Sequence, residues 1–365
     1  MIGVSNMNSP LVSIIILNYN GKQYNGTCID SLINQSYQNF EIVFVDNASS
    51  DGSLEEVERL YKELINKKQL KIVKLKENIG FAGGNNRGVK EASKNSKYIV
   101  LLNNDTYVSK TWLAEMLKAM NMDKSIGVVT PIVYNHHDEE LVKKFIHKQK
   151  KRVTLNIFGE NVAVHNPMYN SEQHPIFFAG GCCLMYKKRL VDAPFMMKQF
   201  AYAEDNYFSW LINMKGYMII QTLKSKVWHY GNGVKKQNKI NALLEFHGTK
   251  NLIMNFFLFY EFWNIVKLFP AFMMIQAAHI LYQPRKLRYK LHAWGWIIKN
   301  FKYILSHRKH IQHQRMVSDK ILFKEMSYKA YDVEGVIPIM RIPLRIFNMF
   351  MKMYCKILLI RTGDM

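Results

Sequence analysis

Cysteine is scarce in this sequence and follows no pattern. The 365 residues contain four cysteines, Cys28, Cys182, Cys183 and Cys355, without any Cys-x-x-Cys spacing. This excludes a disulfide framework and indicates a reducing, cytosolic environment. The first apolar run is about seven residues long and has no charged leader, so we expect no signal peptide.

Long uncharged hydrophobic runs are also missing. The apolar stretch 251–268 is broken by Glu261 and Lys267, and the stretch 268–283 is only about sixteen residues long and contains Pro270. A membrane-spanning helix needs roughly 20 predominantly apolar residues. Neither stretch is therefore predicted to span a membrane.

Acidic residues are few, above all near the C-terminus. The chain has 50 Lys and Arg against 28 Asp and Glu, and residues 234–365 hold 22 of the basic and only seven of the acidic side chains. Aromatic residues and Met accompany this charge, and residues 342–360 mix Ile, Phe, Met and Leu with Arg345, Lys352 and Lys356. An interfacial helix on an anionic membrane needs both ingredients. The alternative is that these helices pack as ordinary core; nucleic acid binding is not expected, because no recognised module accompanies the charge.

What the sequence does contain is a repeated succession of a short apolar run and a polar loop. Residues 11–17 lead into Asn18-Tyr19-Asn20-Gly21, residues 40–45 into Asp46 and Asn47, and residues 98–102 into Asn103-Asn104-Asp105. Such unalternated, β-branched runs are typical of strands buried on both faces of a parallel sheet. Ligands of open α/β sheets bind at the carboxyl ends of the strands, so the pattern predicts a nucleotide site.

The order of elements predicts an α/β fold with a doubly wound, mainly parallel sheet. Helices are expected at 23–35, 54–66 (with Ser53 as N-cap), 87–93, 110–120 and 201–216, and further strands at 70–75, 127–133 and 217–227. Residues 177–186 form an apolar segment centred on Gly180-Gly181. We expect an α/β domain over residues 1–241, with an insertion or flexible loop at about 135–176 that includes the His136-His137 pair. Residues 242–365 are expected to form a helical, basic region that associates with membrane.

Three groups of residues have candidate chemistry. The Gly- and Asn-rich segment 78–88 offers amides and the Arg87 guanidinium for a base or phosphate, although a purely structural turn is equally compatible. Asp105 after a buried strand is a candidate metal ligand, unless it only caps the next helix. Glu204-Asp205 is a second acidic centre, suited to proton abstraction or merely to the dipole of a helix N-terminus. His229 ends a later strand and is a candidate ligand for metal or phosphate, or a structural histidine.

An ordered set of seven motifs, VSIIILNYNG, VDNASSDGS, NIGFAGGNNRG, LLNNDT, FFAGGCCLMYKK, AEDNYFSWLINMKGY and WHYGNG, covers about residues 11–233. Together they resemble family 2 glycosyltransferases with the GT-A fold, specifically the rhamnosyltransferase-like branch that makes O-antigen and cell-wall polysaccharides. The resemblance implies an inverting transfer of a rhamnosyl-like or related hexosyl group. The donor would be a nucleoside-diphosphate sugar, and the acceptor a hydroxyl of a glycan or polyprenol-linked molecule. The protein would act at the cytoplasmic face of the cell membrane, as a peripheral protein.

The resemblance also implies roles for individual positions. Asp205 would be the catalytic base with Glu204 beside it, and Asp105 would bind Mg²⁺ or Mn²⁺ with help from His229. Asn18 and Asp46 would contact the nucleoside, and the other donor-binding residues would be Asn20, Asn78, Gly80, Arg87, Asn103 and Asn104.

The chain departs from the family pattern at two places. The metal motif Asn103-Asn104-Asp105 has a single carboxylate, and Tyr207 and Leu211 stand where an Asp and an Arg often follow the base. These departures leave open a non-catalytic sugar-nucleotide-binding or scaffold protein at the membrane. A sugar-nucleotide pyrophosphorylase is a further alternative, although it needs a basic phosphate loop after the first strand, where this chain has Asn18-Tyr19-Asn20-Gly21.

Overall fold

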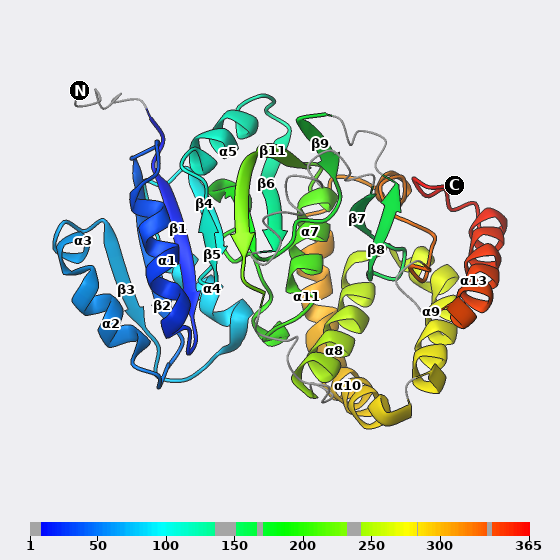
Figure 1. Ribbon diagram of the computed structural model, residues 1–365. Coiled ribbons are helices and arrows are strands. Elements are labelled where there is room, and N and C mark those ends of the chain that lie inside the picture. Colours follow the sequence, from blue (N-terminus) through cyan, green and yellow to red (C-terminus); the bar gives the residue numbers. More distant parts are fainter. Residues whose placement is uncertain (1–8, 136–150, 166–170, 232–241, 283, 334–337) are drawn as a thin grey trace.

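A nine-stranded sheet covered by helices forms the centre of the molecule, and further helices extend from one side of it (Figure 1). The computed structural model describes residues 9–135, 151–165, 171–231, 242–282, 284–333 and 338–365. The strand order along the sheet is β3-β2-β1-β4-β10-β6-β11-β5, and β9 pairs with β11. The predicted His136-His137 pair lies outside the described residues.

The N-terminal half of the sheet is parallel, as predicted. It consists of β1 (Val12–Asn18), β2 (Phe40–Asp46), β3 (Leu70–Lys74) and β4 (Tyr98–Asn103). The β-branched side chains of β1, β2 and β4 are buried on both faces, which explains the unalternated sequence pattern. The register pairs Asn18 with Asp46, and Leu17 with Asn103. The polar strand ends therefore meet along a single edge.

The helices of this half follow the prediction with three corrections. They are α1 (Lys22–Ile33), α2 (Ser53–Leu60), α3 (Lys62–Asn66), α4 (Gly80–Glu91) and α5 (Trp112–Met120). The helix expected at 54–66 is interrupted at Tyr61. Ser53 is not the N-cap, because its hydroxyl accepts a hydrogen bond from the Asn18 amide and Gly52 takes the cap position. The Gly/Asn-rich segment, expected to be a loop up to Arg87, is already helical from Gly80.

Close packing explains why a glycine-rich segment forms helix α4. A Cβ atom at Gly84 would lie 2.3 Å from Leu17 Cδ1, and one at Gly88 would lie 2.3 Å from Ile15 Cγ2. The glycines thus let the helix backbone approach β1 more closely than any side chain would permit. Packing against the sheet outweighs the low helix propensity of glycine here.

We predict that Gly88→Ala lowers the free energy of unfolding by about 1–3 kcal/mol, because the added methyl overpacks a core with no free space. Ile15 and Val45, whose methyl groups it would meet, are fully buried. Gly295→Ala in helix α10 (Leu287–Lys299) is the matched control, since nothing lies within 4 Å of the added Cβ. We expect this control to be neutral or slightly stabilising. Equal denaturation midpoints for the two variants would contradict the packing argument.

The C-terminal half of the sheet is mixed. It contains β5 (Thr106–Val108), β6 (Ile126–Asn135), β9 (Gln173–Ile176), β10 (Cys183–Lys187) and β11 (Met218–His229). Strand β10 runs antiparallel between β4 and β6, whereas β11 is parallel to β6. Helix α7 (Glu204–Met214) precedes β11 and begins later than the expected residue 201, because the backbone of Phe200, Tyr202 and Ala203 has positive φ.

Within the expected insertion or flexible loop at about 135–176, the described residues include three strands, which corrects the reading as a flexible loop. Strands β7 (Lys151–Leu155) and β8 (Asn161–His165) form an antiparallel hairpin, and β9 joins the main sheet. One face of the hairpin buries Val162 and Val164 together with Thr154, which pairs with Val162. Such short strands carry too few alternating positions to stand out from sequence.

The region after residue 242 is helical, as predicted. It comprises α8 (Ala242–Phe259), α9 (Phe262–Tyr282), α10, α11 (Phe301–His313), α12 (Asp319–Phe323) and α13 (Pro338–Ile357). Helix α8 packs on α7, where the ring of Phe259 stacks on that of Trp210 at a centroid distance of 5.2 Å. One hydrophobic core therefore extends from the sheet into these helices.

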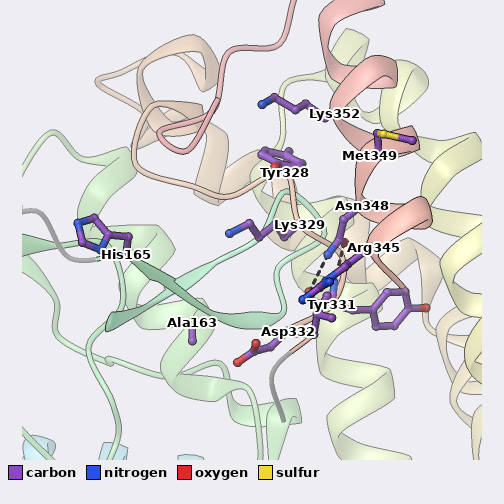
Figure 2. A pocket seen from close by; sticks show the side chains of 11 residues that line it. Ala163, His165, Tyr328, Lys329, Tyr331, Asp332, Arg345, Asn348, Met349 and Lys352 are labelled. Atoms are coloured by element: carbon purple, nitrogen blue, oxygen red, sulfur yellow. Dashed lines mark hydrogen bonds between the residues drawn. The ribbon is translucent and has the colours of Figure 1, made fainter. Parts of the chain in front are cut away.

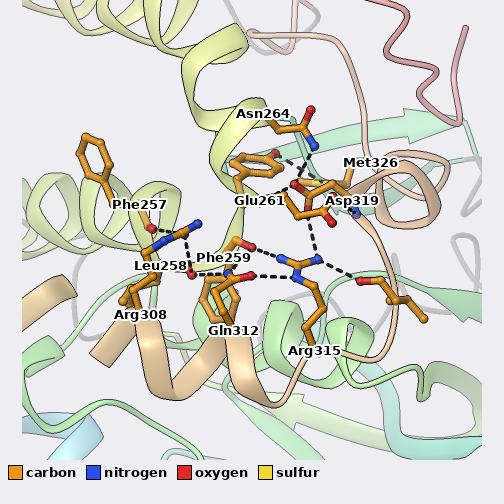
Figure 3. Close-up of polar contacts among 12 residues, drawn as sticks. Phe257, Leu258, Phe259, Glu261, Asn264, Arg308, Gln312, Arg315, Asp319 and Met326 are labelled. Carbon is orange, nitrogen blue, oxygen red and sulfur yellow. Dashed lines mark hydrogen bonds and ion pairs between the residues drawn. The ribbon is translucent and has the colours of Figure 1, made fainter. Parts of the chain in front are cut away.

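Side chains from α11 and the following turn hold the C-terminal end of α8 (Figure 3). Arg308 donates to the carbonyl oxygen of Phe257 at 2.6 Å, Gln312 to that of Leu258 at 2.7 Å, and Arg315 to that of Phe259. These donors satisfy carbonyl groups that a helix end leaves without intrahelical partners, and the positive charges of Arg308 and Arg315 are favourable at the negative end of the helix dipole. The end of α8 is thereby fixed relative to α11.

Within the described ranges, no single helix is both long and apolar enough to cross a membrane. The segments Phe262–Ile280 and Pro284–Lys299 reach the required composition only as a pair, with a bend of 104° between them.

Candidate functional site

A buried polar network joins the loops at the carboxyl edge of the sheet. The Asn18 amide nitrogen donates to Asp46 Oδ1 at 3.0 Å and to the hydroxyl of Ser53 at 2.8 Å. Its carbonyl oxygen accepts from Asn25 and Asn104, each at 3.0 Å. Asn18 is fully buried and Asp46 is 3% exposed. Both side chains therefore hold the loops in place from inside and do not line the adjacent cavity.

A cavity of about 470 Å³ opens beside this network. Its walls come from the segments after β1, β2, β3 and β4 and from Phe200, which precedes α7. The predicted residues Asn20, Asn78, Gly80, Asn103, Asn104 and Asp105 all line it. The structure thus gathers most of the predicted donor-binding residues around one hollow.

The structure places Arg87 elsewhere. Its guanidinium forms an ion pair with Glu91 at 2.9 Å, one turn along α4, and it lines a separate cavity of about 720 Å³. Gly80, with φ +80°, lies at the start of the same helix, where Phe200 occupies the space that a Cβ would need. Only the N-terminal end of α4 reaches the cavity beside Asp105.

Asp105 and His229 meet at the rim of this cavity. His229 ends β11, and its Nε2 atom lies 3.1 Å from Asp105 Oδ1; the amide of Tyr230 also donates to the Asp105 carbonyl oxygen at 2.9 Å. Two neighbouring ligands of one small cation, each about 2.1 Å from it, would be separated by about 3 Å. The pair therefore fits one edge of a divalent-cation site. Across the described residues, no third His, Cys, Asp or Glu joins them.

Glu204 and Asp205 form the acidic centre at the N-terminus of α7. Asp205 Oδ2 accepts from the Gly181 amide at 3.3 Å, and Oδ1 accepts from the Asn206 amide at 2.9 Å. The Cys182 carbonyl, one residue after Gly181, accepts from the Asn103 amide at 2.9 Å. The segment 181–182 therefore links the acidic centre to the end of β4, two residues before Asp105.

Burial raises the pKa of both carboxyl groups. For Glu204, which is 8% exposed, the negative charge of Asp205 raises the pKa further. Among the described residues, Glu204 Oε2 has no hydrogen-bond partner. Buried acids with a raised pKa are suited to accept a proton near neutral pH.

A strained backbone segment presents these acids. Phe200, Tyr202 and Ala203 have φ values of +63°, +66° and +58°, a region that non-glycine residues rarely adopt. The amide nitrogen of Asn251 on α8 donates to the carbonyl groups of Gln199, Ala201 and Tyr202 at 2.6–3.0 Å. Asn255, one turn later, donates to the Ala203 carbonyl at 3.1 Å. Helix α8 thus supports the segment that ends in Glu204.

Tyr207 and Leu211, which form the second departure from the family pattern, are buried away from the acidic centre. Tyr207 is 4% exposed and its hydroxyl lies 3.2 Å from His307 Nε2 on α11, while Leu211 is 3% exposed within the core. The Tyr207 side chain joins α7 to the helical region.

Sequence reasoning missed several lining residues. Tyr19, Gln23, Tyr24, Asn47, Phe81 and Phe200 also line the cavity. Tyr19 directly follows a buried strand and is 52% exposed. Its sequence signal as a lining residue was the presence of an aromatic side chain inside a predicted ligand loop. Phe200 and Asn251 gave no local signal, because the contact between their segments spans about fifty residues of chain.

Comparison with known proteins identifies similar sequences and folds. Residues 13–194 match the sequence profile of "Glycosyl transferase family 2". An uncharacterised glycosyltransferase of Haemophilus influenzae is 25% identical over 215 residues, which is 50% of this chain and 65% of the relative. The minor teichoic acid biosynthesis protein GgaA of Bacillus subtilis is 30% identical over 162 residues, covering 42% of this chain and 35% of the relative. The chain thus spans from about a third to just under two thirds of the length of these relatives.

Among solved structures, GalNAc-T7 with UDP, GalNAc and Mn²⁺ aligns with a TM-score of 0.56 at 15% identity, covering 70% of this chain and 49% of that one. At this identity the likeness concerns the fold alone. It confirms the predicted GT-A fold, with its mixed sheet and the helical region that follows.

Proposed function

We propose that this protein, whose residues 13–194 form a glycosyl transferase family 2 domain, is an inverting glycosyltransferase. It moves a rhamnosyl-like or related hexosyl group from a nucleoside diphosphate to a hydroxyl of a glycan or polyprenol-linked acceptor. The product belongs to a surface polysaccharide, which the likeness to GgaA, named for teichoic acid biosynthesis, supports. The observation that carries the proposal is the Asp105–His229 pair at a cavity rim that is joined through residues 181–182 to Asp205.

Donor binding is assigned to the cavity at the sheet edge. The exposed ring of Tyr19 offers a face on which a nucleobase stacks, and amides of the surrounding Asn residues offer donors to ribose and phosphate. Asn18 and Asp46 act indirectly in this arrangement, since their hydrogen bonds fix the loops that carry these contacts. Asp105 and His229 would hold Mg²⁺ or Mn²⁺. When bound, the cation neutralises negative charge on the departing diphosphate.

Asp205 takes the proton of the acceptor hydroxyl. The hydroxyl oxygen forms a bond to the anomeric carbon while the bond from that carbon to the diphosphate oxygen breaks. The proton moves to a carboxylate oxygen of Asp205. Each of these oxygens accepts one backbone amide and retains a second lone pair for the proton. Attack from the face opposite the diphosphate inverts the anomeric centre and needs no protein nucleophile.

We predict that Asp105→Ala reduces metal-dependent hydrolysis of the donor by about 10²-fold or more, because stabilisation of the leaving group is worth several kcal/mol. A panel of uridine and thymidine diphosphate sugars, assayed with Mn²⁺, Mg²⁺ or a chelator, identifies the donor and measures the effect. Asp123→Ala is the control, since that carboxylate is exposed and bonds only to Ser125. Wild-type turnover by Asp105→Ala would reject the metal assignment.

The same assays distinguish the two alternative functions. Nucleotide binding without any turnover by the wild type would favour the non-catalytic scaffold, and consumption of nucleoside triphosphate would favour a pyrophosphorylase.

We also propose that the protein works as a peripheral protein at the cytoplasmic face of the cell membrane. The excess of basic residues after residue 234 supports this, together with exposed apolar side chains on α9 and α13 such as Trp263, Ile342 and Ile357.

A further inference from the structure

Helix α13 has two apolar faces. Met351 and Cys355 are fully buried against the body of the protein. On the opposite side Ile342, Ile346, Met349, Met353 and Ile357 are 57–76% exposed. Their spacing of three to four residues places them in one line along the helix, which we call the α13 stripe. A helix with one solvated face normally carries polar residues there, so the α13 stripe indicates a surface that meets an apolar partner.

Basic residues lie along one flank between the two faces. Arg345, Lys352 and Lys356 fall there at 100° per residue, and residues 338–357 contain no Asp or Glu. An apolar stripe bordered by cations is complementary to the boundary between acyl chains and anionic headgroups.

The same flank borders a cavity of about 510 Å³ between α13 and the β7–β8 hairpin (Figure 2). Lys329, Arg345, Lys352 and His165 line it, against one acidic side chain, Asp332, among the described lining residues. The contacts described for this part of the chain give Lys329 and Arg345 no ion-pair partner, and Lys352 only the ring of Tyr328, 5.6 Å away. This cavity, which we call the basic cavity, is therefore suited to an anion such as a phosphate monoanion or diester.

The α13 stripe and the basic cavity are continuous. Met349 belongs to both, since it is 60% exposed and also lines the cavity. The helix is held firmly in this position: Asn348 accepts from the amide of Ala330 at 3.0 Å, and the Tyr354 hydroxyl donates to the Lys267 carbonyl on α9 at 2.6 Å. A phosphate bound in the basic cavity would thus lie close to the apolar surface of the α13 stripe.

We propose that α13 lies in the plane of the membrane interface, with the α13 stripe among acyl chains and the basic cavity holding the phosphate of an anionic phospholipid. The inference deepens the membrane attachment proposed above and rests on it. The stripe extends from Ile342 to Ile357, a span of fifteen residue steps or about 22 Å of helix, which a surface covers and a single bound lipid does not. The charge of the flank selects an anionic surface over a second copy of this basic chain.

The test is sedimentation of the full-length protein with vesicles of phosphatidylcholine alone or with added phosphatidylglycerol, at low and physiological salt. We expect binding to need phosphatidylglycerol and to weaken with salt. The cavity variant Lys329→Gln/Arg345→Gln should lower affinity for anionic vesicles roughly 25-fold, about fivefold per charge removed. The matched control Lys320→Gln/Lys324→Gln removes two exposed charges outside the cavity and should change it much less. The stripe variant Ile346→Gln/Met353→Gln should weaken binding to vesicles with phosphatidylglycerol at both salt concentrations.

Equal losses for the cavity variant and its control would overturn the headgroup site, because non-specific attraction would then explain the charge dependence. Binding of inorganic phosphate that the cavity variant abolishes, with vesicle binding unchanged, would assign the cavity to a soluble phosphate instead. A stripe variant that loses self-association but not vesicle binding would make the stripe a contact between copies. If the wild type sediments with neither vesicle while its donor hydrolysis in solution is intact, membrane attachment fails and the transferase assignment stands.

Discussion

Replacing Asp205 by Asn is expected to lower sugar transfer by about 10²-fold or more, since the amide cannot take the proton of the acceptor hydroxyl. Nucleotide affinity should stay near that of the wild type, because Asp205 does not line the donor cavity. The amide retains the shape of the carboxylate, and its carbonyl oxygen still accepts a hydrogen bond from a backbone amide. Initial rates of transfer, together with calorimetric titration of the nucleotide, separate the two effects.

The raised pKa of Asp205 gives this variant a second signature. Burial disfavours the charged form, so the carboxylate is protonated, and the base lost, at a higher pH than for an exposed Asp. The acid limb of kcat/KM should therefore lie above the usual range for Asp. Because the folded state binds this proton more tightly than the unfolded state, stability falls as pH rises through the window between the two pKa values.

Asp205→Asn removes that penalty. The variant should therefore melt at a higher temperature than the wild type above pH 7 and show no such gain near pH 3. Asp192→Asn, an exposed carboxylate outside the donor cavity and the acidic centre, is the control for both measurements. Normal transfer by Asp205→Asn would show that the base is elsewhere, and an unchanged melting temperature at high pH would show that the carboxylate is not destabilised by burial.

The sequence allowed the sheet edge to be predicted because its signals are local. Buried strands such as Val12–Asn18 read as continuous apolar runs, and Asn18, Asp46 and Asp105 directly follow or end them. Parallel register then brings these residues together without any further information. The sequence did not predict which of them face the cavity and which are structural. Only the structure shows that Asn18 and Asp46 hydrogen-bond to each other and that Asp105 faces His229.

The remaining features depend on contacts between distant segments. Helix α4 was predicted to begin too late, because Gly84 favours a loop until the close approach of β1 is known. Likewise, the sequence places Phe256 and Tyr260 in the apolar, basic region after residue 242 and does not show what they pack against. The structure buries both completely in the core around Trp210. Tertiary packing decides such cases, and it has no signature at the residue itself.

Asn251→Leu is expected to lower the rate of transfer by about 10- to 10²-fold, although Asn251 lies on α8 and contacts no predicted substrate position. Its amide supplies hydrogen bonds to three carbonyl groups of the segment before Glu204, and leucine of similar size supplies none. The backbone of Tyr202 and Ala203 is strained by about 1–3 kcal/mol per residue, so without these bonds it relaxes and shifts the acids.

A loss of stability alone would not produce this result, which the control Asn348→Leu establishes. Asn348 is likewise a buried asparagine with three hydrogen bonds to backbone groups, and it lies on α13 away from the acidic centre. Both variants should lose about 1–3 kcal/mol of unfolding free energy. Only Asn251→Leu should also lower kcat and move the acid limb of the pH profile downward, because the relaxed segment lets water reach Asp205 and returns its pKa toward that of an exposed acid. If the two variants lose activity in parallel with stability and keep the same pH profile, Asn251 is part of the core and does not position the base.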